Sequence, residues 1–127
     1  MDWSNSDYES FKANSTTPEV FEWFKVKLGR APEGSDIYRF AKGFFELGSY
    51  SRALCCLQAY ITLPNPSPQA RHLLGYCYLN LNELEKALRE FKLCVKDNFH
   101  EDWQLVVELL LEIAQKQHSQ SSEPQEY

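Results

Sequence analysis

The residues of this sequence most capable of chemistry are its cysteines and histidines, and the spacing of the cysteines argues against a reactive centre. Cys55, Cys56, Cys77 and Cys94 form no Cys-x-x-Cys pair and have no histidine nearby at the spacing of a zinc site. Cysteine otherwise behaves as a small apolar residue in helix cores. We therefore predict four buried free thiols and no metal site.

The histidines and acidic residues offer no catalytic arrangement. His72, His100 and His118 are scattered without a partner pattern, and the sequence has no glycine-rich phosphate-binding loop. On a solvated helix, Lys86 and Arg89 would pair with the acidic residues Glu83, Glu85 and Glu90. The chain is predicted not to be an enzyme and to need no cofactor.

The charge balance excludes some classes of partner. The chain has 13 Lys and Arg against 18 Asp and Glu, a net charge of -5, which opposes a basic surface that follows phosphates. No apolar run approaches the roughly 20 residues that span a bilayer, and Asp2, Asp7 and Glu9 do not fit a signal peptide. We expect a cytoplasmic or nuclear protein, for which a membrane or a nucleic acid is a poor first choice of partner.

The elements of the chain repeat with a period of about 34 residues. At this offset Phe40 meets Leu74, Ala41 meets Gly75, Phe44 meets Tyr78, Leu47 meets Leu81, Ala53 meets Ala87, Leu57 meets Phe91 and Ile61 meets Val95. Apolar residues recur three and four apart, and Gly48-Ser49 and Asn80-Leu81-Asn82 form the turns. Each unit is predicted to be a helical hairpin, whose small residues let the two helices approach closely. The fold class is all-α.

The ends of the helices can also be predicted. Ser67 and Pro68 open the second unit as an N-cap followed by a first-turn proline, and a short helix runs from Thr17 to Gly29. A further capping helix within residues 102–116 carries a wide apolar stripe of Leu105, Val106, Leu109, Leu110 and Ile113. The predicted division is a flexible N-terminal segment 1–16, a helical domain 17–117 and a disordered polar tail 118–127.

A helix-turn-helix unit of this length, with Leu74-Gly75-x-x-Tyr78 and Ala87-x-x-x-Phe91, resembles the tetratricopeptide repeat (TPR). The resemblance covers residues 34–101. It implies a solenoid of about two TPR-like hairpins, flanked by an N-terminal helix and a C-terminal capping helix. Because each repeat buries its surface mainly on its neighbours, both flanking helices are structurally required.

TPR stacks commonly bind peptides or helices in the groove lined by the first helix of each repeat. The outward positions predicted here, beside Glu46, are Tyr38, Lys42, Phe45, His72, Tyr76, Leu79 and Asn80. Rigid aromatic side chains give a large contact area at small entropy cost, which suits an apolar or mixed peptide. In the alternative interpretation, Phe45 and Leu79 simply pack against the capping helices.

The chaperone-binding TPR class grips the C-terminal carboxylate of Hsp70 or Hsp90 with Lys, Asn and Arg side chains. The repeat register places Tyr38, Lys42, Leu73, Trp103 and Val107 at those positions. Most of the charged donors are missing, so the carboxylate clamp is predicted to be absent.

The sequence also resembles a narrower TPR group, the N-terminal domain of the large Ran-binding nucleoporin of the pore's cytoplasmic filaments. The shared residues, over roughly positions 36–110, are Phe40-Ala41-Lys42, Glu46, Tyr50, Tyr60-Ile61, Pro68, Ala70, Leu74-Gly75, Lys86-Ala87 and Leu105-Val106. This resemblance implies a role in the nuclear pore or in transport.

The predicted function is that of a protein-interaction adaptor or scaffold, whose helical solenoid presents an aromatic groove to a protein or peptide partner. A first alternative is a structural subunit that self-associates through its capping helices into a homo-oligomer. A second is weak single-stranded RNA binding, in which Tyr38, Phe45 and Tyr76 stack on bases beside a local basic patch. That patch would consist of Arg39, Lys42 and Arg71.

Overall fold

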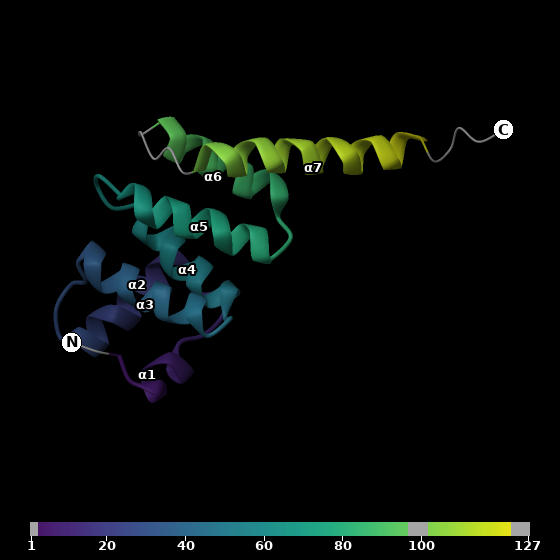
Figure 1. Ribbon diagram of the computed structural model, residues 1–127. Coiled ribbons are helices and arrows are strands. Elements are labelled where there is room, and N and C mark those ends of the chain that lie inside the picture. The colour runs from purple at the N-terminus through teal and green to yellow at the C-terminus, as the bar shows by residue number, and fades with distance from the viewer. Residues whose placement is uncertain (1–2, 97–101, 123–127) are drawn as a thin grey trace.

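The computed structural model describes residues 3–96 and 102–122, and for 102–103 and 117–122 it describes the backbone alone. The described part forms seven helices and no strand: α1 (Asn5–Ser10), α2 (Thr17–Leu28), α3 (Gly34–Glu46), α4 (Tyr50–Tyr60), α5 (Pro68–Asn80), α6 (Leu84–Lys96) and α7 (Asp102–Ser122). Helices α3 to α6 stack as two hairpins, with α1 and α2 at one end and α7 along the other (Figure 1). The predicted all-α hairpin solenoid is confirmed.

The repeat register of the sequence is also the register of the helices. Helix α5 begins and ends one repeat length after α3, and α6 begins one repeat length after α4. The turns between the helices of each hairpin match as well, because Gly48 and Asn82 both adopt left-handed backbone conformations, with φ of 78° and 61°. Glycine and asparagine tolerate this conformation better than other residues do. The sequence therefore specifies the two hairpins in the same way.

The predicted helix ends carry the expected caps. In α2, the Thr16 hydroxyl accepts a hydrogen bond from the Glu19 backbone N–H, the Glu19 carboxylate accepts one from the Thr16 N–H, and Gly29 ends the helix with φ of 71°. In α5, the Ser67 hydroxyl accepts a hydrogen bond of 3.2 Å from the Ala70 N–H, and Pro68 stands in the first turn.

Packing within each hairpin follows the paired positions of the repeat. The pairs Phe40 and Leu74, Ala53 and Ala87, and Leu57 and Phe91 are fully buried. Gly75 lies directly under the Phe91 ring, where an added Cβ would come within 2.7 Å of the ring. The pair Leu47 and Leu81 behaves differently, because Leu47 lies in the turn after α3 and its side chain is 65% exposed.

The N-terminal segment packs against the first repeat, which was not predicted from the sequence. The Tyr8 ring stacks on Phe40 at 4.7 Å, Trp3 lies 4.7 Å from the same ring, and the Phe11 side chain is 1% exposed. The prediction that residues 1–16 are flexible concerns motion and stays a prediction. The structure shows that residues 3–11 supply core side chains to the described fold.

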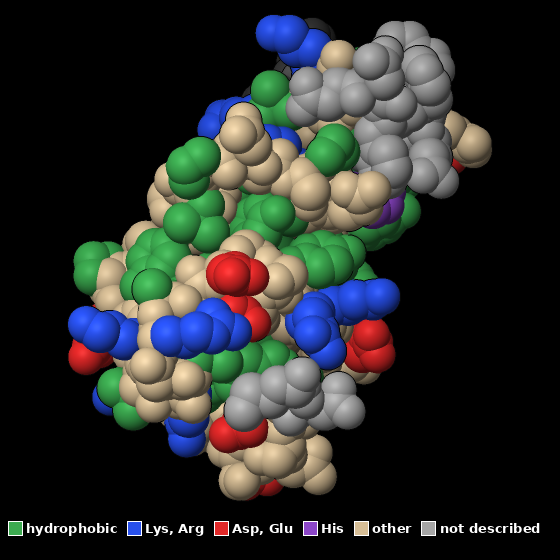
Figure 2. All heavy atoms as spheres, turned by 90° about the vertical axis from the view of Figure 1, so that its left-hand side faces the viewer, with side chains coloured by type: hydrophobic (Ala, Val, Ile, Leu, Met, Phe, Trp, Pro, Cys, Tyr) green, Lys and Arg blue, Asp and Glu red, His purple; other side chains and the backbone are tan. Residues whose placement is uncertain are grey.

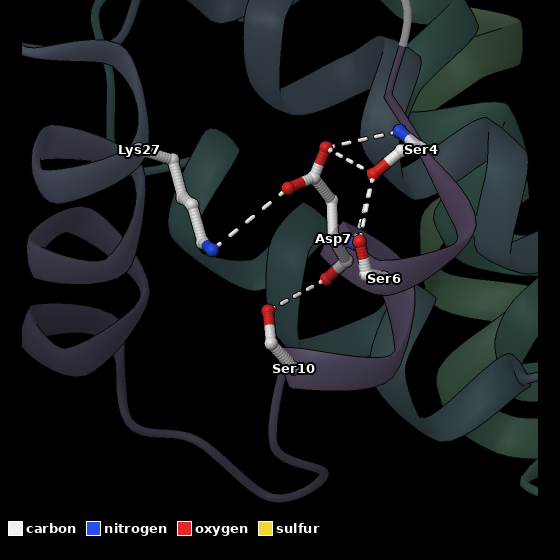
Figure 3. Close-up of polar contacts among 5 residues, drawn as sticks. All are labelled: Ser4, Ser6, Asp7, Ser10 and Lys27. Carbon is white, nitrogen blue, oxygen red and sulfur yellow. Dashed lines mark hydrogen bonds and ion pairs between the residues drawn. The ribbon is translucent and has the colours of Figure 1, made fainter.

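Polar contacts also hold α1 in place (Figure 3). The Ser4 backbone N–H donates to the Asp7 carboxylate at 2.9 Å, and Lys27 of α2 forms an ion pair of 3.8 Å with the same carboxylate. The Ser4 N–H is the main reason that the pKa of Asp7 lies below its usual value. A six-residue helix is marginal by itself, so these contacts and the aromatic packing stabilise it.

Helix α7 caps the other end, as predicted. Val106 and Leu109 are buried against α6, and Leu105 and Ile113 pack beside them, whereas Leu110 is 45% exposed. Leu110 of the apolar stripe therefore lies outside the buried face of α7. The helix continues to Ser122, so residues 118–122 of the predicted disordered tail are helical, and residues 123–127 lie outside the described residues.

Candidate protein-binding surface

The predicted partner-binding residues lie on equivalent faces of two neighbouring helices. Helix α3 carries Tyr38, Lys42 and Phe45, and α5 carries His72, Tyr76, Leu79 and Asn80. Tyr38, Lys42 and Phe45 are the repeat equivalents of His72, Tyr76 and Leu79. Within each helix the spacing of four and then three residues places the side chains on one face, and α3 and α5 contact each other.

The structure brings some of these side chains into direct contact. The rings of Phe45 and Tyr76 lie 6.5 Å apart across the α3–α5 junction, and the rings of His72 and Tyr76 lie 4.8 Å apart. Tyr50, which was not assigned to the surface from the sequence, packs edge-on against Phe45 at 5.2 Å. Its position at the start of α4, just after the turn that follows Phe45, is the feature of the sequence that could have indicated this contact. The result is an aromatic row from α4 to α5.

Exposure divides the predicted residues into two groups. Lys42 and Asn80 are exposed, whereas Tyr38, Phe45, His72, Tyr76 and Leu79 are half-buried. Phe45 packs against the core cluster that runs from Phe11 to Cys77, and Leu79 packs against the cluster that contains Val106 and Leu109 of α7. The packing of Leu79 agrees with the alternative interpretation. The assignment of this surface to partner binding stays a prediction.

The polar groups of the surface differ in their availability. The Asn80 side-chain amide donates a hydrogen bond of 2.8 Å to the Tyr76 carbonyl, so one of its donors is used within α5. The Lys42 ammonium has no ion-pair partner among the described residues. Lys42 is therefore a cation that this surface can offer to a carboxylate of a partner.

The charge arrangement corrects one expectation. Glu90 was assigned to a solvated face with Lys86 and Arg89, but its side chain is buried and forms an ion pair of 3.1 Å with Arg71. The Glu90 side chain is buried because it points toward α5, where Arg71 can neutralise its charge. The expected surface pairing does occur between Glu83 and Lys86, at 3.6 Å.

The ion pair also reduces the basic patch considered for RNA binding, since the Arg71 charge is compensated by Glu90. On the face shown in Figure 2, Lys and Arg side chains are interspersed with Asp and Glu. A mixed surface of this kind does not form the continuous basic track that single-stranded nucleic acid follows.

The four cysteines are buried thiols outside any disulfide, as predicted. Burial raises the pKa of the Cys77 thiol to about 12 and that of Cys56 well above its usual value. Thiols that stay protonated at neutral pH are poor nucleophiles and poor metal ligands. Among the described residues, no group of His, Cys, Asp and Glu side chains is arranged to hold a metal ion.

A surface cavity of about 380 Å³ lies apart from the predicted residues, between the start of α6 and α7. Its charged lining has both signs, from Glu83, Glu85, Lys86, Arg89 and Lys116. This mixture does not select a ligand of one charge. Within the described part of the chain, no helix is both long and apolar enough to span a membrane.

Comparison with known proteins identifies the repeats. The model of the family described as anaphase-promoting complex, cyclosome, subunit 3 matches residues 28–94, which are 67 of the 127 residues. No curated protein and no solved structure gave a match. The matched region contains α3, α4 and α5 and most of α6, which are the two predicted repeats. The chain therefore belongs to the anaphase-promoting complex, cyclosome, subunit 3 family, a family of TPR-like repeats.

Proposed function

We propose that this chain is a non-catalytic adaptor that binds a segment of another protein across α3 and α5. The observation that carries the proposal is the aromatic row at the junction of the two helices, where the Phe45 and Tyr76 rings lie 6.5 Å apart. Half-buried aromatic side chains held by a core bind a partner at little cost in conformational entropy. Membership of a TPR-like family supports a protein partner.

The proposed ligand is an apolar or mixed segment with a carboxylate near Lys42. The half-buried Phe45, Tyr76 and Leu79 side chains would contact its apolar groups. The Lys42 ammonium, which has no ion-pair partner among the described residues, would contact its acidic group. The proposal includes one such contact and no chaperone-type carboxylate clamp.

Charge reversal tests this proposal without disturbing the core. The full chain, a Lys42→Glu variant and a Lys92→Glu variant are each used to capture proteins from cell extract, and bound proteins are quantified by mass spectrometry. Both lysines are exposed, but Lys92 lies on α6 and makes the matched control. Lys42→Glu is expected to reduce capture of specific partners by about tenfold.

The control decides the interpretation. The proposal predicts that Lys92→Glu captures the same proteins as the unaltered chain, and that circular dichroism shows both variants folded. Equal capture by Lys42→Glu and the unaltered chain would place partner binding elsewhere on the molecule.

We further propose that the partner belongs to a large protein assembly in the nucleus or cytoplasm. The family to which the chain belongs carries the name of a subunit of a protein complex, the anaphase-promoting complex. The resemblance to the nucleoporin TPR domain favours an assembly at the nuclear pore. Fluorescence microscopy of the tagged full chain, with size fractionation of extract, tests this. Enrichment of the tagged chain at the nuclear rim would support an assembly at the nuclear pore. Elution in a large size fraction without enrichment at the rim would support another assembly. Elution as the free protein would contradict both.

A further inference from the structure

Helix α7 has a second apolar face that points away from the body of the protein. Its inner face buries Val106 and Leu109, which are 5% and 3% exposed. The side chains of Val107, Leu110 and Leu111 are 44%, 45% and 60% exposed, and we call these three residues the outer ridge. Their spacing of three and four residues places them along one side of the helix.

The outer ridge follows from the way α7 is rotated on α6. In the repeat register, the α7 positions equivalent to the buried Leu74 and the half-buried Tyr78 are Glu108 and Glu112, which are exposed. Helix α7 therefore does not repeat the packing of α5, although it begins one repeat length later. It uses one apolar side for α6 and leaves the other side available, and Figure 1 shows α7 at the end of the stack.

The charges beside the ridge indicate what kind of helix fits it. Glu108 lies one turn from Leu111, Glu112 lies one turn further along, and both are exposed. Glu108 is held by a hydrogen bond of 2.9 Å from the Gln104 side chain. Lys116, one turn beyond Glu112, reaches instead toward the Asn82 side chain at 3.5 Å. The edge of the ridge is therefore acidic.

This acidic edge disfavours a second copy of the chain as the occupant. Two α7 helices packed antiparallel along their ridges would bring their Glu108 and Glu112 edges together, and like charges at such positions repel. A helix with Lys or Arg along the matching edge would instead form favourable pairs across the contact.

We propose that the outer ridge of α7 docks an amphipathic helix of another protein, with an aliphatic stripe against Val107, Leu110 and Leu111 and basic residues facing Glu108 and Glu112. A helix fits better than an extended segment, because its backbone hydrogen bonds are satisfied internally and its side chains interlock with a ridge of this spacing. This surface is separate from the aromatic row on α3 and α5, so the chain would join two partners.

Two synthetic peptide probes test the proposal with the full chain. Both are helices of about five turns with leucines at spacings of three and four, and one carries lysines along one edge where the other carries glutamates. Fluorescence anisotropy should show the lysine peptide binding more tightly. Leu110→Gln with Leu111→Gln should weaken that binding by about tenfold or more. Val26→Gln on α2, where Val26 is 71% exposed, is the matched control and should leave it unchanged.

Charge reversal gives a readout that loss of folding cannot imitate. The Glu108→Lys, Glu112→Lys variant should prefer the glutamate peptide, which reverses the order of affinities. Equal binding of the two peptides to the unaltered chain would overturn the proposal. An equal loss of lysine-peptide binding in the Val26→Gln variant would also overturn it. The same holds if ultracentrifugation shows that the unaltered chain is a dimer and that the Leu110→Gln, Leu111→Gln variant is a monomer.

Discussion

At the scale of single residues, close approach of the paired helices depends on small side chains at equivalent positions. The sequence predicted this from Ala41 and Gly75, and the Phe91 ring lies directly over Gly75. The pattern was readable because a small residue recurs at the same place in both repeats, beside bulky neighbours. Replacing Gly75 by Ala normally favours a helix, but here the added Cβ would collide with the ring.

Gly75→Ala should therefore lower the free energy of unfolding by about 1–3 kcal/mol, the usual cost of overpacking. Urea unfolding followed by circular dichroism measures it, with Gln69→Ala at an exposed position of α5 as control. A Gly75→Ala protein as stable as the control would contradict the close contact.

The ion pair of the partly exposed Arg71 with the buried Glu90 could not be predicted from one helix at a time. In the first repeat the equivalent positions are Ile37 and Cys56, both buried and uncharged, so the pair replaces an apolar contact. Glu90→Cys alone leaves Arg71 unpaired and should cost about 1–3 kcal/mol, a range reduced because Arg71 is partly exposed.

The double variant Arg71→Ile, Glu90→Cys restores the chemistry of the first repeat and should recover most of that loss in chemical denaturation. A double variant less stable than Glu90→Cys would show that the ion pair itself is required.

At the scale of helices, carboxylates near helix starts link stability to pH. The pKa of Asp36 lies below its usual value, first because Arg30 donates hydrogen bonds to its carboxylate. Its stabilising effect is present above the unfolded-state pKa, close to 3.8, and is lost as pH falls through the lower folded-state pKa. Unfolding measured between pH 7 and pH 2 should show stability falling below about pH 4. Asp36→Asn should reduce that fall, and an unchanged pH profile would contradict this role.

The C-terminal cap is the helix on which the second repeat depends. Deleting residues 102–127 removes Val106 and Leu109 and uncovers part of the Leu84, Ala87 and Phe91 cluster, so a loss of about 3–6 kcal/mol is expected. Thermal melting measures it, with deletion of 123–127 as the control. An unchanged melting temperature after the longer deletion would contradict the capping role.

At the scale of the whole molecule, the sequence predicted the repeats better than the ends. Two copies of one pattern in the same register support each other, whereas α1 is a single short helix that depends on the contacts of Trp3, Tyr8 and Phe11 with the first repeat. The outer ridge could not be predicted from the sequence for a related reason. A wide apolar stripe does not show which side of a helix its neighbour covers.

Binding of a protein segment across α3 and α5 is tested most directly by site-specific photocrosslinking. A photoreactive phenylalanine analogue is placed at position 46, which is exposed on α3 one turn beyond Lys42 and leaves Lys42 in place, or at position 92 of the full chain in cells. Crosslinks to a discrete partner from position 46, with few from position 92, are the result expected. Crosslinks from position 92 alone, or equal labelling from both positions, would contradict binding at this surface.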